Sequence, residues 1–113
     1  MSKFQELLSM ARYHAEPVKL LLLFTQAHIE SSKNEVNKGI IEPVMCVDKL
    51  PAELNDYSTL CLEADSINHQ WDLLFVTSIS ADVDKSVIES SMKSMINDVQ
   101  SGKNTAMYIV LDR

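Results

Sequence analysis

Four polar residues stand where predicted strands end, and they are the best candidates for a functional site. Asp48, Ser78, Ser80 and Asp112 close or follow apolar segments of the chain. Ligands of open sheets gather beyond the carboxyl ends of parallel strands, so parallel strands would bring these residues to one edge. Hydroxyl and carboxylate groups there would bind a small polar ligand. Simpler roles are favoured, with Asp48 and Asp82 as helix caps and Asp112 as part of a solvated chain end.

Other kinds of chemistry find little support in the residue types and their spacing. Gly39 and Gly102 form no phosphate-binding loop between a strand and a helix. The three histidines stand in separate connections and show no ligand spacing, so no metal site is predicted. Cys46 and Cys61 form neither a CxxC motif nor a zinc pattern, and we expect both to be reduced, buried thiols. The sequence therefore predicts no cofactor and favours a non-catalytic protein over an enzyme.

Charge and composition limit the kinds of partner. The 113 residues include 10 basic and 16 acidic side chains, giving a net charge of −6, and no dense cluster of Lys or Arg. Nucleic acid and anionic membrane surfaces bind several cations on one face, so neither is expected as a partner. The longest apolar run is about half a membrane span, and the first six residues lack the features of a secretory signal. We expect one globular domain, residues 1–113, in the cytoplasm.

The elements that must position the candidate residues are built around the apolar run at 17–26. This run lacks helical spacing and is too short to cross a membrane, so it predicts a strand buried on both faces. Pro43 predicts a bulge or an edge strand, and Gly102 predicts a left-handed helix end. The polar stretch from Glu30 to Gly39 is predicted to be a loop, with a flap over a site as the alternative. Further strands are predicted at 40–48, 71–79 and 105–111, and helices at 3–14, 51–67 and 83–101.

The element order α-β-β-α-β-α-β predicts the α/β class, with α+β as the alternative. We expect a mixed four-stranded sheet with three helices, in which the first two strands are antiparallel neighbours and both strand-helix-strand units are parallel crossovers. Four strands make a sheet roughly 19 Å wide and one helix covers about 10 Å, so three helices leave part of one face bare. Because a bare apolar patch usually marks an interface, we predict a homodimer or a protein partner.

Some segments of the chain resemble a known family. The stretch from Pro43 to Lys49 (PVMCVDK), with 51–54 and 71–76, is similar to a family of small uncharacterised bacterial proteins, over most of the chain. Some members carry the label of a ribonucleotide reductase alpha subunit, but that enzyme needs a large barrel and several redox cysteines, which this chain lacks. The resemblance implies a bacterial source and brings no activity or functional residues. The predicted function is that of a homodimeric or accessory interaction protein, with a small-ligand-binding protein or minor enzyme as the alternative.

Overall fold

The computed structural model describes residues 3–13, 16–30, 38–54, 56–102 and 108–112. Helices and strands follow one another in the predicted order, with one short 3-10 helix added. They are α1 (Lys3–Arg12), β1 (Val18–Glu30), β2 (Lys38–Lys49), η1 (Pro51–Glu53), α2 (Tyr57–Ile67), β3 (Leu73–Ser80), α3 (Lys85–Ser101) and β4 (Ile109–Asp112). Among the described helices, none is long and apolar enough to cross a membrane.

All neighbouring strands of the sheet are antiparallel, so the fold belongs to the α+β class. The strand order is β2-β1-β3-β4, and the predicted antiparallel pairing of the first two strands is confirmed. Both β2 and β3 are antiparallel to β1, so they run parallel to each other on either side of it. The expected parallel arrangement of β3 and β4 is wrong, because these strands are antiparallel neighbours.

β1 is the strand around which the sheet is built. Residues 20–25 are at most 2% exposed, which confirms the prediction of a strand buried on both faces. Successive side chains of a strand point to opposite faces. Leu20 and Leu22 therefore join the apolar cluster on one face, and Leu21 and Leu23 join the cluster on the other.

Pro43 lies at a β-bulge in the pairing of β1 with β2. Met45 stands opposite Phe24, whereas Pro43 stands opposite the next residue, Thr25. β2 is also an edge strand of the sheet. Both positions suit a proline, because its missing N–H cannot contribute to a ladder of hydrogen bonds.

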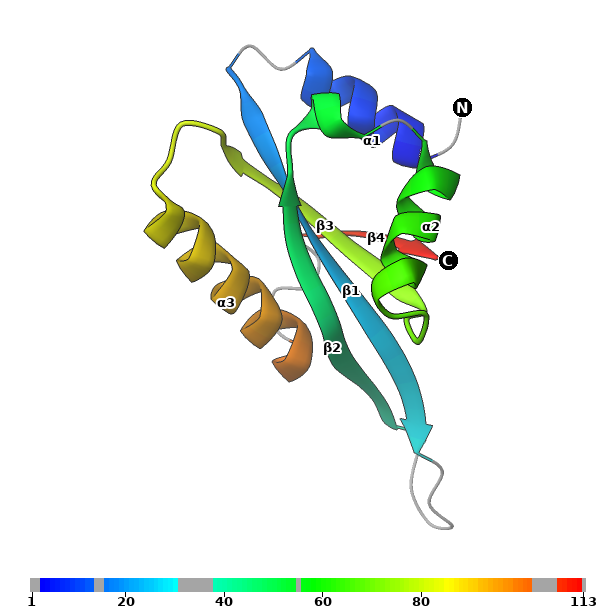
Figure 1. Cartoon of the computed structure of the whole chain (residues 1–113). Helices are drawn as coiled ribbons and strands as arrows, with labels where there is room; N and C mark the ends of the chain where they lie inside the picture. The colour runs from blue at the N-terminus through cyan, green and yellow to red at the C-terminus, as the bar shows by residue number, and fades with distance from the viewer. Residues whose placement is uncertain (1–2, 14–15, 31–37, 55, 103–107, 113) are drawn as a thin grey trace.

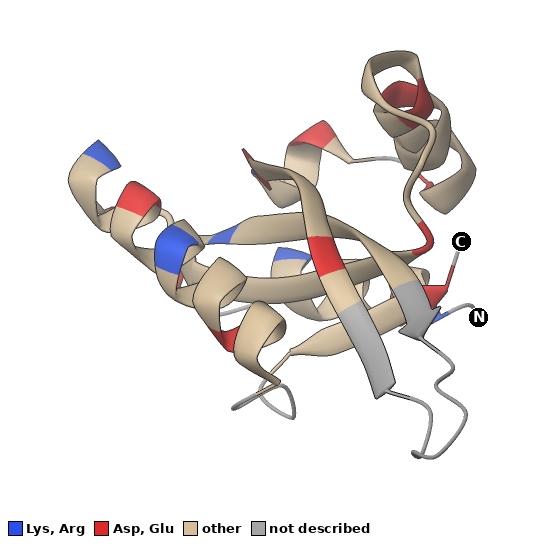
Figure 2. Cartoon of the chain, turned by 90° about the horizontal axis from the view of Figure 1, so that it is seen from below, with Lys and Arg blue, Asp and Glu red and all other residues tan. Residues whose placement is uncertain are grey.

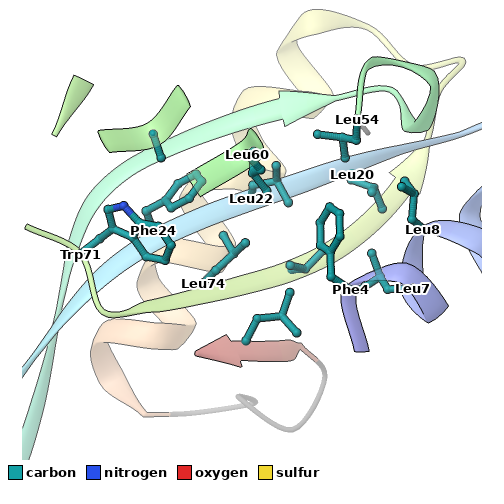
Figure 3. Packing of buried hydrophobic residues seen from close by; sticks show 13 residues of the cluster. Phe4, Leu7, Leu8, Leu20, Leu22, Phe24, Leu54, Leu60, Trp71 and Leu74 are labelled. Atoms are coloured by element: carbon teal, nitrogen blue, oxygen red, sulfur yellow. The ribbon is translucent and has the colours of Figure 1, made fainter. Parts of the chain in front are cut away.

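α1 and α2 cover one face of the sheet, and α3 covers the other (Figure 1). On the first face, Phe4 of α1 and Leu60 of α2 belong to one apolar cluster with β1 and β3 (Figure 3). Trp71 lies in this cluster edge-on to Phe24, with ring centroids 5.0 Å apart. Its Nε1 donates a hydrogen bond to Asp65 Oδ1 over 3.0 Å, which satisfies the polar atom of a buried ring.

Among the described helices, α3 is the one that covers the second face of the sheet. Met95 of α3 belongs to one buried cluster with Leu21, Leu23 and Phe75 of the sheet. Among the large apolar strand residues whose side chains the structure describes, only Ile109 is exposed, at 38%. The expectation of a bare sheet face is therefore wrong for these strands, and apolar side chains that reach solvent lie mainly on the helices.

The two ends of α3 test two further predictions. As the sequence predicted, Gly102 adopts the left-handed conformation, with φ of 73°. Its N–H donates to the carbonyl oxygen of Asp98. At the amino end the capping position is held by Asp84 rather than by Asp82. The helix therefore begins at Lys85, slightly later than expected.

β1 and β2 extend further than the sequence predicted. Glu30 pairs with Lys38, so both strands continue into the stretch that was expected to be a loop. Residues 31–37 of that stretch lie outside the described residues. The rest of the predicted loop, and the alternative prediction of a flap over a site, fall on those residues.

Candidate functional site

Asp48 lies on the face of the sheet that α3 covers. It stands opposite Leu21, a member of the apolar cluster under α3. Lys19 Nζ donates a hydrogen bond to Asp48 Oδ2 over 2.8 Å, and the Lys19 and Asp48 side chains are 21% and 35% exposed. This hydrogen bond, assisted by the charge of Lys19, lowers the pKa of Asp48. Asp48 is thus an ion-paired carboxylate that fastens β2 to β1.

Ser78 and Ser80 lie on the other face, the one that α1 covers. Ser78 stands opposite Leu20, and Ser80 stands opposite Val18. Ser80 Oγ accepts a hydrogen bond from the backbone N–H of Asp82 over 3.3 Å, so it supports the turn that follows β3. Ser78 is exposed and lines a groove. Of these two serines, only Ser78 lines that groove.

Asp112 lies at the opposite end of β3 from Ser80. It pairs with Leu73, the first residue of β3, whereas Ser80 is the last. At about 3.3 Å per residue, roughly 23 Å separates the two ends of β3. The carbonyl oxygen of Asp112 accepts a hydrogen bond from Tyr57 Oη over 2.8 Å. The structure therefore does not bring the four predicted residues together, because β4 runs opposite to the expected direction and Asp48 faces α3.

A groove of about 240 Å³ lies between α1 and the sheet. Four elements contribute to it. Its lining consists of Leu7, Met10 and Ala11 from α1, Val18 and Leu20 from β1, Val76, Thr77 and Ser78 from β3, and Ile109 from β4. The groove is larger than the hollow beside α2 described below and lies slightly below the ~300 Å³ at which ligand pockets usually begin.

The groove has a buried apolar floor and an exposed apolar rim. Leu20 and Val76 are 2% and 1% exposed, whereas Met10 and Ile109 are 73% and 38% exposed. Its described lining residues carry no charge, and Ser78, whose side chain lies on the face that α1 covers, supplies a hydroxyl group. Such a lining binds apolar groups by removing them from water, and it offers no side chain suited to proton transfer near neutral pH.

α1 places an apolar projection beside the groove. Tyr13 follows Met10 by one helical turn and is 87% exposed, and its N–H donates to the carbonyl oxygen of Ser9 over 3.1 Å. Residues three apart on a helix are surface neighbours, so Met10 and Tyr13 stand side by side. Arg12 Nη2 donates to the carbonyl oxygen of Leu54 over 2.8 Å, which fixes this end of α1 against the chain after η1.

A smaller hollow of about 60 Å³ lies between β2 and α2. Lys49 Nζ donates a hydrogen bond to Glu63 Oε1 over 2.9 Å, and both residues line the hollow. This hydrogen bond raises the pKa of Lys49. The volume is far below the ~300 Å³ of ordinary ligand pockets, so the ion pair closes a packing gap between two elements.

Two strongly raised pKa values belong to groups outside the groove. Burial, with a smaller effect from the charge of Asp48, raises the pKa of the Cys46 thiol to about 11, so the thiol stays protonated at neutral pH. Tyr108 Oη donates to Asp98 Oδ2 over 2.6 Å. Burial and this carboxylate raise the pKa of Tyr108 to about 12. Cys46 and Cys61 are both half-buried, which corrects the expectation of fully buried thiols.

Metal-binding geometry is not found in the part of the chain that the structure describes. There, no three His, Cys, Asp or Glu side chains are grouped closely enough to hold an ion. Local partners explain the shifted pKa values of Asp48 and Lys49, which lie in the pairs Lys19–Asp48 and Lys49–Glu63.

The sequence did not single out Met10 and Tyr13. They continue the row that begins with Lys3 and Glu6 on the outward side of α1, and all four residues are exposed. A methionine and a tyrosine at the end of a charged row are the signal that could have indicated an apolar surface there.

Similarity to other proteins does not identify a function for this chain. No protein-family model, curated protein or solved structure matches it. The resemblance of the segment from Pro43 to Lys49 to a bacterial family stays a prediction.

Proposed function

We propose that the chain is a non-catalytic interaction protein that works as a homodimer or as an accessory subunit of a protein complex. The observation that carries this proposal is the uncharged groove, with the exposed side chains of Met10 and Ile109 in its lining and that of Tyr13 one helical turn from Met10. Large apolar side chains gathered at a hollow of the surface are typical of protein interfaces.

Two further features support a binding role over a catalytic one. The groove lining contains no carboxylate, imidazole, amine or thiol, so the described residues provide it with no strong acid, base or nucleophile. Cys46, whose thiol has a pKa of about 11, lies in the cluster on the other face of the sheet. A bacterial cytoplasmic location is part of the proposal, and it agrees with Cys46 and Cys61 being thiols.

Light scattering coupled to gel filtration tests the proposal directly. A homodimer has twice the chain mass of 12.7 kDa, and its proportion falls when the protein is diluted through the micromolar range. Higher salt should leave an apolar interface intact, whereas it would weaken association through surface charges. A monomer at every concentration, with no protein partner retained by the tagged chain over a tagged control protein, contradicts the proposal.

The alternative function, a small-ligand-binding protein, is supported by one feature of the same groove. Ser78 is exposed in its lining and is the one predicted site residue found there. A ligand at 100 times its dissociation constant stabilises the folded state by about 2.7 kcal/mol, so a thermal-shift screen with small apolar alcohols and acids tests this function. Ala11→Leu, which fills the groove from α1, should abolish such a shift.

A further inference from the structure

We propose that the groove and the side chains of Met10, Tyr13 and Ile109, together called the α1 patch, are the contact surface for a second copy of this chain. The inference rests on the proposed function and names the surface that carries it. It commits to a symmetric dimer in which the α1 patch of one copy meets the α1 patch of the other.

The α1 patch carries a projection and a hollow next to each other, which is what a two-fold interface requires. In such an interface the same surface must serve both partners, so each projecting group needs a receiving hollow on the identical patch. Met10 and Tyr13 project from α1 with 73% and 87% of their surface exposed. A dry cavity of about 150 Å³ admits benzene, so the groove of about 240 Å³ has room for either side chain of a second copy.

Charge favours the α1 patch over the other exposed apolar surface, on α2. Leu62 and Ile67 of α2 are 71% and 70% exposed, so they are a competing surface. However, the hollow beside Ile67 is lined by the charged pair Lys49 and Glu63, and α2 itself carries acidic residues and no basic ones (Figure 2). The groove beside α1 is lined by uncharged residues, so a second copy that docks there removes fewer charges from water.

The edges of the sheet are poorly suited to joining two copies through a continuous sheet. On β4, the carbonyl oxygens of Val110 and Asp112 accept hydrogen bonds from Lys3 Nζ and Tyr57 Oη over 3.1 and 2.8 Å. On β2, Pro43 lacks an N–H and sits at a bulge. Both features are typical of edges that are protected against strand addition. Packing of side chains is therefore the more favourable mode of contact.

A stable dimer needs a contact area larger than the groove itself. A stable interface buries about 800 Å² per partner, which is about a tenth of the 7382 Å² that this chain exposes. The groove cannot supply this area alone. The contact must also include the outward row of α1, and Ile109 on β4 places the far boundary of the patch on the sheet edge.

A matched pair of substitutions tests the inference. Met10→Glu places a charge in the patch, and Leu62→Glu places the same charge at an equally exposed position of α2. The dimer dissociation constant, from sedimentation equilibrium, should rise at least about 30-fold for Met10→Glu, because the charge would be buried against a second copy. Leu62→Glu should change it less than about threefold. Far-UV circular dichroism checks folding, and Tyr13→Glu is the second patch variant if Met10→Glu is not folded.

The outcomes separate the inference from the proposed function. A wild-type dimer that is weakened by Leu62→Glu and not by Met10→Glu or Tyr13→Glu overturns the α1 patch and leaves the homodimer standing. A wild-type chain that is monomeric but retains a specific protein partner overturns the inference and supports the accessory form of the function. A monomer without any partner overturns both.

Discussion

Tyr57 Oη donates a hydrogen bond of 2.8 Å to the carbonyl oxygen of Asp112, which joins the first residue of α2 to the last residue of β4. The Tyr57 ring also packs against Phe4 of α1, with centroids 5.2 Å apart. One side chain thus connects three elements that lie far apart in the chain. Its hydroxyl group and its ring make separate contributions to stability, and two substitutions can separate these contributions.

Tyr57→Phe should lower the free energy of unfolding by about 1 kcal/mol, because it removes the hydrogen bond and keeps the ring. Tyr57→Leu should cost about 0.5–1.5 kcal/mol more, because the ring contact with Phe4 is also lost. Urea unfolding, followed by the fluorescence of the single tryptophan, measures both values. Equal losses for the two variants would show that the ring contact contributes nothing.

Asp48→Asn should make stability less dependent on pH in the acid range. The pKa of Asp48 is lowered in the folded state from an ordinary value of 3.8, so its ion pair with Lys19 stabilises the protein above that pH. The stabilisation is lost as the pH falls through the folded pKa. Because the pair is partly exposed, Asp48→Asn should cost at most about 1 kcal/mol at pH 7, and the cost should shrink progressively as the pH falls below the unfolded pKa toward the folded one.

The control for this experiment is Glu89→Gln, which neutralises an exposed carboxylate of α3. It should change stability by less than ~0.5 kcal/mol at either pH. A difference between wild type and Asp48→Asn that stayed constant from pH 3 to pH 7 would contradict the role given to the ion pair.

Cys46 should react slowly with iodoacetamide in the folded protein. With a pKa of about 11, its thiolate fraction at pH 8 is about 100-fold lower than that of a thiol with the ordinary value of 9.0. Mass spectrometry of the peptide that contains Cys46 gives the rate, and the same peptide in urea-unfolded protein is the control. Equal rates in the folded and unfolded protein would rule out burial of this thiol.

Gly102→Ala should destabilise the protein by about 1 kcal/mol, although the added methyl group meets no atom within 4 Å. The cost arises from the backbone, because φ of 73° is unfavourable for a residue with a Cβ atom. Gly102→Asn should cost less, since asparagine adopts this conformation more readily. Ser94→Ala, at an exposed position inside α3, is the control and should not destabilise the helix. A loss for Ser94→Ala equal to that for Gly102→Ala would argue against a conformational origin.

The sequence predicts well the features that depend on one segment alone. The apolar run from Val18 to Thr25 lacks helical spacing, and burial on both faces follows from that composition. Pro43 and Gly102 each impose a backbone constraint that few positions of a fold can accept, so both were placed correctly. Such signals are local and do not depend on the neighbours in the fold.

The direction of β4 was not predictable in the same way. Alternation of apolar residues reads the same along a strand in either direction, so the segment from Ile109 to Asp112 is compatible with both. The 17 residues of α3 span about 25 Å, which is long enough for a parallel crossover. Pairing partners decide the direction, and these are a property of the whole sheet.

The candidate site depended on that direction and on register. Asp48 and Ser78 belong to strands on either side of β1, but their positions in the alternation place them on opposite faces of the sheet. Register is fixed mainly by packing between elements, which one sequence does not reveal, although the bulge at Pro43 was predicted. Met10 was not predicted to be part of a functional surface, because it follows charged residues on the outward row of α1.

β1 is hydrogen-bonded to a strand on each side and packed on both faces, so both apolar clusters contain residues of this one strand. Neither layer of helices can separate from the sheet without exposing residues of this strand. The chain should therefore melt in one cooperative transition, and the amides of residues 21–24 should exchange with deuterium only through global opening.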